Sequence, residues 1–293
     1  MTADVSLTIL DGGLSREIVA QGGVLRQPEW SALALMEQPD AVARAHAAFA
    51  AAGAEVTTTN AYALVPFHLG DAWTPEHARA LAQHAGRLAR DNAGGGRVAG
   101  CLPPPLGSYR PDAFDAAEAA RILAPLVEGQ ADHVDLWLAE TISSSAEARG
   151  VAAALSGSER PVWMAFTLDD RLDGPPVLRS GEAVGDAVAV AGDLGAAAVL
   201  FNCSRPEVME AAVRIAAGAG VETGAYANAF APAHDDGALG TANETLHDVR
   251  RDLSPDAYAT FAERWVDAGA TIVGGCCGIG AAHIAALRDR LRP

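Results

Sequence analysis

The amino-acid sequence predicts an α/β protein that folds as a single (β/α)8 TIM-type barrel over residues 1–293. Short runs rich in β-branched residues recur eight times, and alanine-rich segments with helical spacing lie between them. The runs are nearly continuously apolar, which is typical of parallel strands covered by helices. A chain of 293 residues with 50% hydrophobic side chains is ordinary for one such barrel. An open, doubly wound sheet is the alternative architecture.

The predicted strands leave room for a helix in most of their connections. In chain order they cover residues 7–10, 54–60, 97–102, 134–140, 161–168, 197–203, 223–228 and 270–276. The clearest helices are predicted over residues 39–54, 75–93, 115–131, 254–270 and 281–291. Two stretches interrupt the alternation, and they cover residues 103–114 and 229–255. Pro and Gly exclude regular structure from the first, and the length of the second is typical of a lid or binding loop.

Charge and cysteine content narrow the class of protein. The chain has 21 basic and 37 acidic side chains, which argues against binding to nucleic acid or to an anionic membrane surface. No run approaches the ~18 apolar residues of a spanning helix, and the N-terminal segment does not resemble a signal peptide. Four scattered cysteines do not make a disulfide framework. We therefore expect a cytoplasmic protein with reduced cysteines and small-molecule partners; assembly into a homo-oligomer is left open.

Residues capable of chemistry gather where the predicted strands end. In a (β/α)8 barrel the active site lies at this carboxyl end. The residues placed there are Asp11, Gly12, Gly13, Thr58, Thr59, Asn60, Tyr62, Glu140, Thr141, Asn202, Cys203, Ser204, Tyr226, Asn228, Cys276 and Cys277. Three of the four cysteines are therefore expected at one rim.

The adjacent pair Cys276–Cys277 indicates a turn rather than a disulfide. Neighbouring Cα atoms lie ~3.8 Å apart, below the ~4.4 Å lower limit for unstrained bridges, and the flanking glycines permit a sharp turn. Together with Cys203, the pair offers three thiolates, a donor set that suits Zn²⁺. Cys101 is expected to be a small buried core residue. A fourth ligand from His234 or His247 stays possible; otherwise the ion keeps an open position.

Three thiolates around a divalent ion leave the site with net negative charge. Such an ion is a weak Lewis acid for water, and it keeps an incoming thiolate electron-rich. The donor set therefore favours alkyl transfer to a thiol over hydrolysis. A zinc-binding barrel without turnover and a vicinal-dithiol redox protein are the alternatives.

Five segments resemble, in order, the signature segments of the homocysteine S-methyltransferases. They read "LDGGLSREI", "TTTNAY", "LAETISS", "LFNCSRPEVM" and "IVGGCCGIGAAHI", and they extend from about residue 8 to 290. The resemblance implies a (β/α)8 barrel that binds Zn²⁺ through Cys203, Cys276 and Cys277. It also implies transfer of a methyl group from a cationic donor to the thiol of homocysteine, which forms methionine.

The resemblance also implies how homocysteine is held. Asp11 and Glu140 match positions that face the α-ammonium group, whereas the N–H groups of Gly12 and Gly13, with Thr58 or Thr59, match positions near the carboxylate. Asn202 and Asn228 are expected to orient loops or cysteines, and no catalytic base beyond the metal is expected. Aromatic side chains that can face a donor cation, or instead belong to the core, are Tyr62, Trp137, Trp163, Phe166 and Tyr226.

The donor is not fixed by these segments, because "YANAF" at residues 226–230 departs from the "YPNSG" of many family members. A barrel without folate or cobalamin domains, and without a C-terminal arm, most resembles members that use S-methylmethionine or S-adenosylmethionine. Betaine or another onium donor is the alternative, and another thiol or a selenol remains open as the acceptor.

Overall fold

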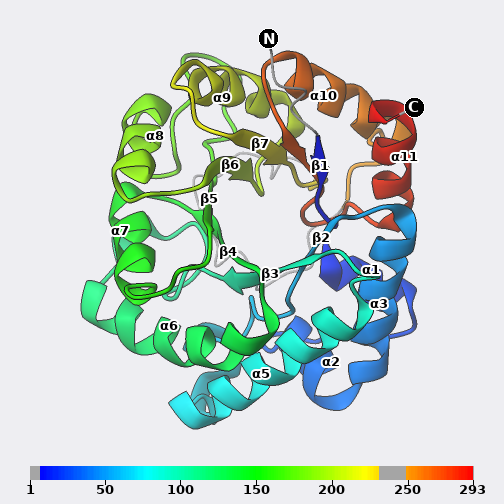
Figure 1. Ribbon diagram of the computed structural model, residues 1–293, viewed down its shortest axis with the longest axis vertical. Helices are drawn as coiled ribbons and strands as arrows, with labels where there is room; N and C mark the ends of the chain where they lie inside the picture. Colours follow the sequence, from blue (N-terminus) through cyan, green and yellow to red (C-terminus); the bar gives the residue numbers. More distant parts are fainter. Residues whose placement is uncertain (1–6, 231–248, 293) are drawn as a thin grey trace.

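The computed structural model describes residues 7–230 and 249–292, and these residues form a ring of parallel strands surrounded by helices (Figure 1). The strands are β1 (Thr8–Ile9), β2 (Val56–Thr58), β3 (Arg97–Leu102), β4 (Leu136–Ile142), β5 (Val162–Phe166), β6 (Ala198–Asn202), β7 (Thr223–Tyr226) and β8 (Ile272–Val273). Their order in the sheet is β1-β8-β7-β6-β5-β4-β3-β2. A parallel bridge between Leu10 and Val56 joins the two ends of this series. The barrel is therefore closed, and the open-sheet alternative is wrong.

The helices lie outside the ring (Figure 1). They are α1 (Leu14–Ala20), α2 (Ser31–Glu37), α3 (Pro39–Ala52), α4 (Pro66–Leu69), α5 (Pro75–Asn92), α6 (Ala116–Gln130), α7 (Ser145–Ala154), α8 (Val184–Asp193), α9 (Pro206–Gly218), α10 (Pro255–Asp267) and α11 (Ala281–Leu291). The five helices predicted from the sequence begin and end within three residues of the observed bounds. No described helix has both the length and the apolar character that crossing a bilayer requires.

The irregular stretches follow the prediction as far as the structure describes them. Residues 103–114 contain only the short 3-10 helix Pro111–Ala113. Residues 231–248 of the predicted long loop, including His234 and His247, lie outside the described residues. Several strands are shorter than predicted, because their last residues leave the sheet to build the rim.

Apolar side chains fill the barrel interior below the rim. This buried cluster consists of Leu10, Val56, Ala99, Leu136, Leu138, Trp163, Ala165, Ala198, Leu200, Tyr226 and Ile272. Successive side chains of a strand point to opposite faces, so residues two positions apart share a face. Glu140 and Asn202 therefore follow Leu138 and Leu200 on the inward face, one layer nearer the carboxyl end. The interior is a packed core, and the polar groups stand at its mouth.

Candidate active site at the carboxyl end of the barrel

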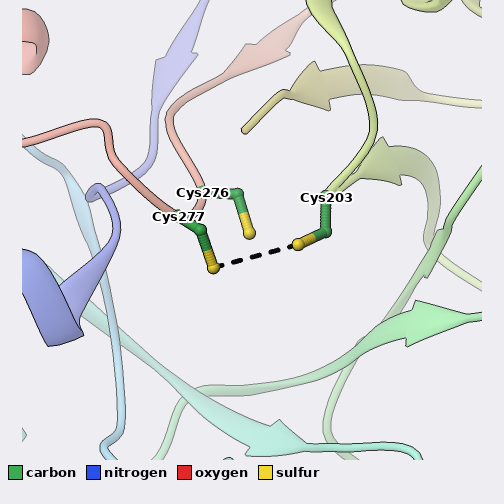
Figure 2. A group of neighbouring side chains, drawn as sticks. All are labelled: Cys203, Cys276 and Cys277. Carbon is green, nitrogen blue, oxygen red and sulfur yellow. Dashed lines mark hydrogen bonds between the residues drawn. The ribbon is translucent and has the colours of Figure 1, made fainter. Parts of the chain in front are cut away.

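The two adjacent cysteines lie on a turn that follows β8. The Cys276 N–H donates to the carbonyl of Ala227 at 2.9 Å, and its own carbonyl accepts from the Ile279 N–H at 3.0 Å. Gly278 has a φ of 86°, a conformation that a residue with a side chain rarely adopts. The backbone thus reverses at the pair, as the sequence predicted, and both thiols lie on the side that faces Cys203 (Figure 2).

Cys203 follows β6 directly and has an unusual backbone conformation. Its φ is 49°, which is costly for a residue other than glycine and persists only where neighbours fix it. Its N–H donates to the carbonyl of Tyr226 at 3.3 Å. Its carbonyl accepts from the hydroxyls of Tyr109 at 3.2 Å and Thr167 at 3.4 Å. These contacts hold the Cys203 side chain toward the turn after β8.

The three sulfur atoms have the spacing that a tetrahedral metal site requires. The Sγ atoms of Cys203, Cys276 and Cys277 all lie within 4.8 Å of one another, and those of Cys203 and Cys277 are 3.9 Å apart (Figure 2). Zn–S bonds of about 2.3 Å in a tetrahedron place sulfurs about 3.8 Å apart. Within the described part of the chain, these are the metal-ligating side chains that converge in this way. The residues present therefore fit a zinc ion.

The thiols share a negative charge among themselves. Hydrogen bonds from Cys276 and Cys277 hold the pKa of Cys203 well below its usual value. The ionised Cys203 in turn raises the pKa of Cys276 and of Cys277 well above the usual range. One thiolate thus forms first, and a divalent cation would displace the remaining protons.

Asp11 lies just beyond β1, and its carbonyl accepts from the N–H of Gly275, next to the cysteine turn, at 3.0 Å. It is 4% exposed, and its two oxygens accept from the Thr58 N–H at 2.7 Å and the Thr58 hydroxyl at 2.9 Å. Burial raises the pKa of Asp11 to about 8, although both bonds from Thr58 act against this shift. The carboxyl is therefore held in one orientation in a site where its charge is costly.

Glu140 on β4 is the second carboxyl at the mouth, and it is partly exposed. Its Oε1 accepts a hydrogen bond from the thiol of Cys101 at 3.0 Å. Burial raises the pKa of Glu140 to about 7, and the negative charge of Cys203 adds to this shift. Cys101 is fully buried, as predicted for a core residue, but the sequence did not reveal its contact with Glu140.

Two further tyrosines lie near these groups. The hydroxyl of Tyr62 is 2.6 Å from that of Ser108. Tyr226 is buried, and its hydroxyl approaches Glu140 closely enough to lower the pKa of that carboxyl. Within the described residues, the Tyr226 hydroxyl makes no hydrogen bond of normal length. The negative charges of Cys203 and Glu140 act on both tyrosines, which therefore belong to the mouth, one of the two locations expected from the sequence.

The other three aromatic candidates lie away from the mouth. The indole N–H of Trp137 donates to Ser158 at 2.9 Å, and its ring lies against Gly100. Trp163 lies deep in the barrel, where the guanidinium of Arg97 stacks on its ring at 5.2 Å. Phe166 is fully buried in the core outside the strands. These three rings pack the core rather than face a ligand.

Three of the residues expected near a substrate carboxylate already have hydrogen-bond partners within the chain. The Gly13 N–H donates to the carbonyl of Ile279 at 2.8 Å, and Thr58 uses both of its donors on Asp11. The Thr59 hydroxyl donates to Gln130 at 2.5 Å and accepts from the Cys101 N–H at 3.0 Å. Gly13, Thr58 and Thr59 thus have partners within the chain, and they brace the site rather than offer donors to it.

Gly12 and Gly13 are nevertheless required by the close approach of two backbone segments. A Cβ at Gly12 would lie 2.3 Å from the carbonyl oxygen of Ile279, and one at Gly13 would lie 2.4 Å from that of Cys276. Only glycine permits the segment after β1 to pack against the cysteine turn at this distance.

Two asparagines hold the loops that carry site residues. The Asn202 amide accepts from the N–H of Thr141 at 2.9 Å and donates to its hydroxyl at 3.0 Å, which fixes the residue next to Glu140. The backbone N–H of Asn228 donates to the carbonyl of Ser204 at 3.0 Å, and its side chain hydrogen-bonds Cys203 and lowers the pKa of that thiol. These contacts are of the kind expected for residues that orient loops and cysteines.

His283, in α11, plays a packing role. Its Nδ1 accepts from the Gly280 N–H at 3.3 Å, and its Nε2 lies 3.1 Å from the carbonyl of Leu253. The ring packs edge-on against Tyr258. Both ring nitrogens therefore have partners away from the three sulfurs.

Comparison with known proteins agrees with this geometry. The family model for homocysteine S-methyltransferase matches residues 8–291. Homocysteine S-methyltransferase of Escherichia coli K12 is 29% identical, over 97% of this chain and 95% of that protein. Homocysteine S-methyltransferase 1 of Arabidopsis thaliana is 26% identical, over 92% of this chain and 88% of that protein.

A solved structure supports the same relationship. The metallated form of the homocysteine methyltransferase MmuM from Escherichia coli aligns with a TM-score of 0.79 at 26% identity. The alignment covers 97% of this chain and 96% of that one. The chain therefore belongs to the homocysteine S-methyltransferase family.

Proposed function

We propose that this protein transfers a methyl group from a cationic donor to the thiol of homocysteine and forms methionine, with Zn²⁺ bound by Cys203, Cys276 and Cys277. The observation that carries the proposal is the position of three convergent thiols beside two carboxyls, buried Asp11 and partly exposed Glu140, in a chain of this family. None of the described groups that shift the pKa of Asp11 or Glu140 is a cationic side chain. A pair of acids in this situation suits a ligand that brings its own positive charge.

When bound, zinc supplies a site at which a thiol is held as a nucleophilic thiolate at neutral pH. The residues of the chain fix the rest of the substrate. Asp11 and Glu140 face the α-ammonium group, and the bare backbone of Gly12 approaches the carboxylate. Thr58 holds Asp11 in place through two hydrogen bonds, and Cys101 holds Glu140 through one. With its amino-acid end held in this way, homocysteine points its sulfur toward Cys203, Cys276 and Cys277.

The charge at the mouth also explains why a cationic donor is suited to the site. The thiolate and the ionised carboxyls attract a sulfonium group, and the rings of Tyr62 and Tyr226 offer it π faces. The sulfur lone pair of homocysteine forms the new S–C bond, and the electrons of the broken bond stay on the donor sulfur. A cation and an anion become two neutral products, which a site of low polarity favours. S-methylmethionine and S-adenosylmethionine fit this description, and betaine is the alternative.

The direct test is a product assay with zinc-loaded protein. The protein is incubated with homocysteine and, separately, with S-methylmethionine, S-adenosylmethionine or betaine, and methionine is quantified by mass spectrometry. We expect methionine with a sulfonium donor and none with the Cys203→Ser variant. Absence of methionine with every donor, from protein that holds one zinc per chain, would refute the proposed activity.

A further inference from the structure

Tyr109 makes a contact that the proposed reaction does not yet account for. It lies in the irregular stretch 103–114, and its hydroxyl is 3.0 Å from the Sγ of Cys203 and 3.2 Å from the carbonyl oxygen of the same residue. A phenol has one proton to donate, and an ionised sulfur is the more strongly charged acceptor. The Tyr109 hydroxyl therefore donates its hydrogen bond to the Sγ of Cys203 once that sulfur is ionised.

The ring of Tyr109 is itself held from behind. The guanidinium of Arg179 stacks on the ring, 4.6 Å from its centroid. Arg179 forms an ion pair with Asp170 at 2.7 Å, and the other oxygen of Asp170 accepts from the Arg205 N–H at 2.8 Å. Arg179 thus links the ring to the segments that follow β5 and β6. A cation over the ring also draws electron density from the phenol, which strengthens its O–H as a donor.

The backbone at Tyr109 is strained in a way that favours a functional role. Its φ is 62°, an uncommon value for an aromatic residue, and Cys203 itself has a φ of 49°. Residues in such conformations persist when the surroundings over-determine them, and they cluster at sites with a function. Here both strained residues meet at one hydrogen bond.

We propose that Tyr109 is a positioning residue that keeps Cys203 a spectator ligand, so that the methyl group goes to the substrate sulfur. This proposal rests on the zinc site and the methyl transfer proposed above. Any thiolate at the mouth can attack the donor: its lone pair forms an S–CH₃ bond, the old bond's electrons stay on the donor, and Cys203 becomes S-methylcysteine. A hydrogen bond from Tyr109 stabilises the lone pairs of Cys203 and makes it the poorer nucleophile.

The experiment compares zinc-loaded wild type with Tyr109→Phe, using iodomethane as a small methyl donor that needs no binding pocket. Peptide mass spectrometry follows methylation at Cys203, with Cys276 and Cys277 in the same sample as internal references. We expect methylation at Cys203 to rise roughly tenfold relative to the two references. In competition with a chelator, we expect Tyr109→Phe to bind zinc about tenfold more weakly than wild type does.

Tyr258→Phe is the matched control. In wild type the Tyr258 hydroxyl is also buried beside the site, but it donates to the carbonyl of Gly274 at 2.7 Å and contacts backbone rather than sulfur. The proposal is overturned if Cys203 is methylated equally fast in Tyr109→Phe and wild type, or if Tyr258→Phe gives the same rise.

Arg179→Lys provides a second variant that retains the hydroxyl. It keeps the charge but loses the planar group over the ring, and we expect a smaller rise at Cys203 in the same direction. Zinc stoichiometry distinguishes failure of the proposed function from failure of the role of Tyr109. Wild type that binds no zinc would refute the proposed function, whereas normal zinc binding with unchanged Cys203 reactivity would refute the role of Tyr109 alone.

Discussion

The two halves of the mouth are held in different ways. In the thiol half, backbone conformation decides where the sulfurs lie: Cys203 has a positive φ, and the Cys276–Cys277 pair lies on a glycine turn. In the carboxylate half, hydrogen bonds to the acid groups themselves hold the side chains: Asp11 accepts from the N–H and the hydroxyl of Thr58, and Glu140 accepts from the thiol of Cys101. Short side chains on a fixed backbone are in place before a ligand arrives.

The difference in support corresponds to a difference in charge. The thiol half already concentrates a negative charge on Cys203. In the carboxylate half, burial raises the pKa of Asp11 to about 8 and that of Glu140 to about 7, so at pH 7 Asp11 is mostly protonated and Glu140 is about half protonated until a cation binds. The thiol half is therefore preformed, whereas the carboxylate half is completed by its ligand. Substitutions in the thiol half are therefore expected to reduce zinc binding, and substitutions in the carboxylate half are expected to reduce binding of the ammonium group, each without the other.

The largest effect is expected from breaking the thiol half. Cys277→Ser removes one of three ligands, and we expect zinc affinity to fall at least roughly 100-fold, with loss of methionine formation. Chelator competition measures the affinity. Binding of methionine, which has an ammonium group but no thiol, is expected to persist and is measured by calorimetry. Zinc affinity equal to that of wild type would contradict the three-thiol site.

Changes in the carboxylate half should weaken methionine binding and leave zinc binding intact, the reverse of the result expected for Cys277→Ser. In Asp11→Asn the amide oxygen still accepts from the Thr58 N–H and the amide nitrogen donates to the Thr58 hydroxyl, so the fold is preserved. Loss of a charge-assisted contact is expected to weaken methionine binding roughly 10–100-fold, while zinc stays at wild-type stoichiometry. Glu140→Gln is expected to behave alike.

Glu147→Gln is the matched control for these two variants. Burial also raises the pKa of Glu147 to about 7, but its carboxylate accepts from the Ser143 N–H at the start of α7. It should leave methionine binding unchanged. An equal loss of binding in Glu147→Gln would show that any buried carboxyl has this effect, and that Asp11 and Glu140 do not contact the ammonium group.

The same contrast explains what the sequence could predict. The barrel and the three thiols follow from strand periodicity and from cysteines at strand ends, and both are fixed by local chain geometry. The partners of the carboxyls are not readable in this way. Cys101 was expected only as a core residue, and its contact with Glu140 joins residues 39 apart. Tyr109 lies 94 residues from Cys203 in a stretch without periodicity, so no sequence pattern indicates their contact.

The pH dependence of binding sharpens the comparison further. An ammonium group favours the ionised acids, so below pH 8 the binding of methionine must release protons from Asp11 and, below pH 7, from Glu140 as well. We expect affinity to fall as the pH is lowered from 8 to 6, by about tenfold per pH unit for each acid that is protonated. Calorimetry in buffers of different ionisation enthalpy measures the released protons.

The smallest effect is expected at Cys101, which acts on the carboxylate half through Glu140. Its hydrogen bond lowers the pKa of Glu140, so Cys101→Ala should raise that pKa and shift the low-pH limb of methionine binding upward. Because a thiol is a weak donor, we expect binding at pH 7 to weaken only about twofold to fivefold. At pH 9 Glu140 is ionised in either protein, and the difference should vanish. Cys101→Ser, which keeps a donor in place, should follow wild type at both values. A loss in Cys101→Ala that is the same at pH 7 and pH 9 would mean that the residue acts by packing and not through the charge of Glu140.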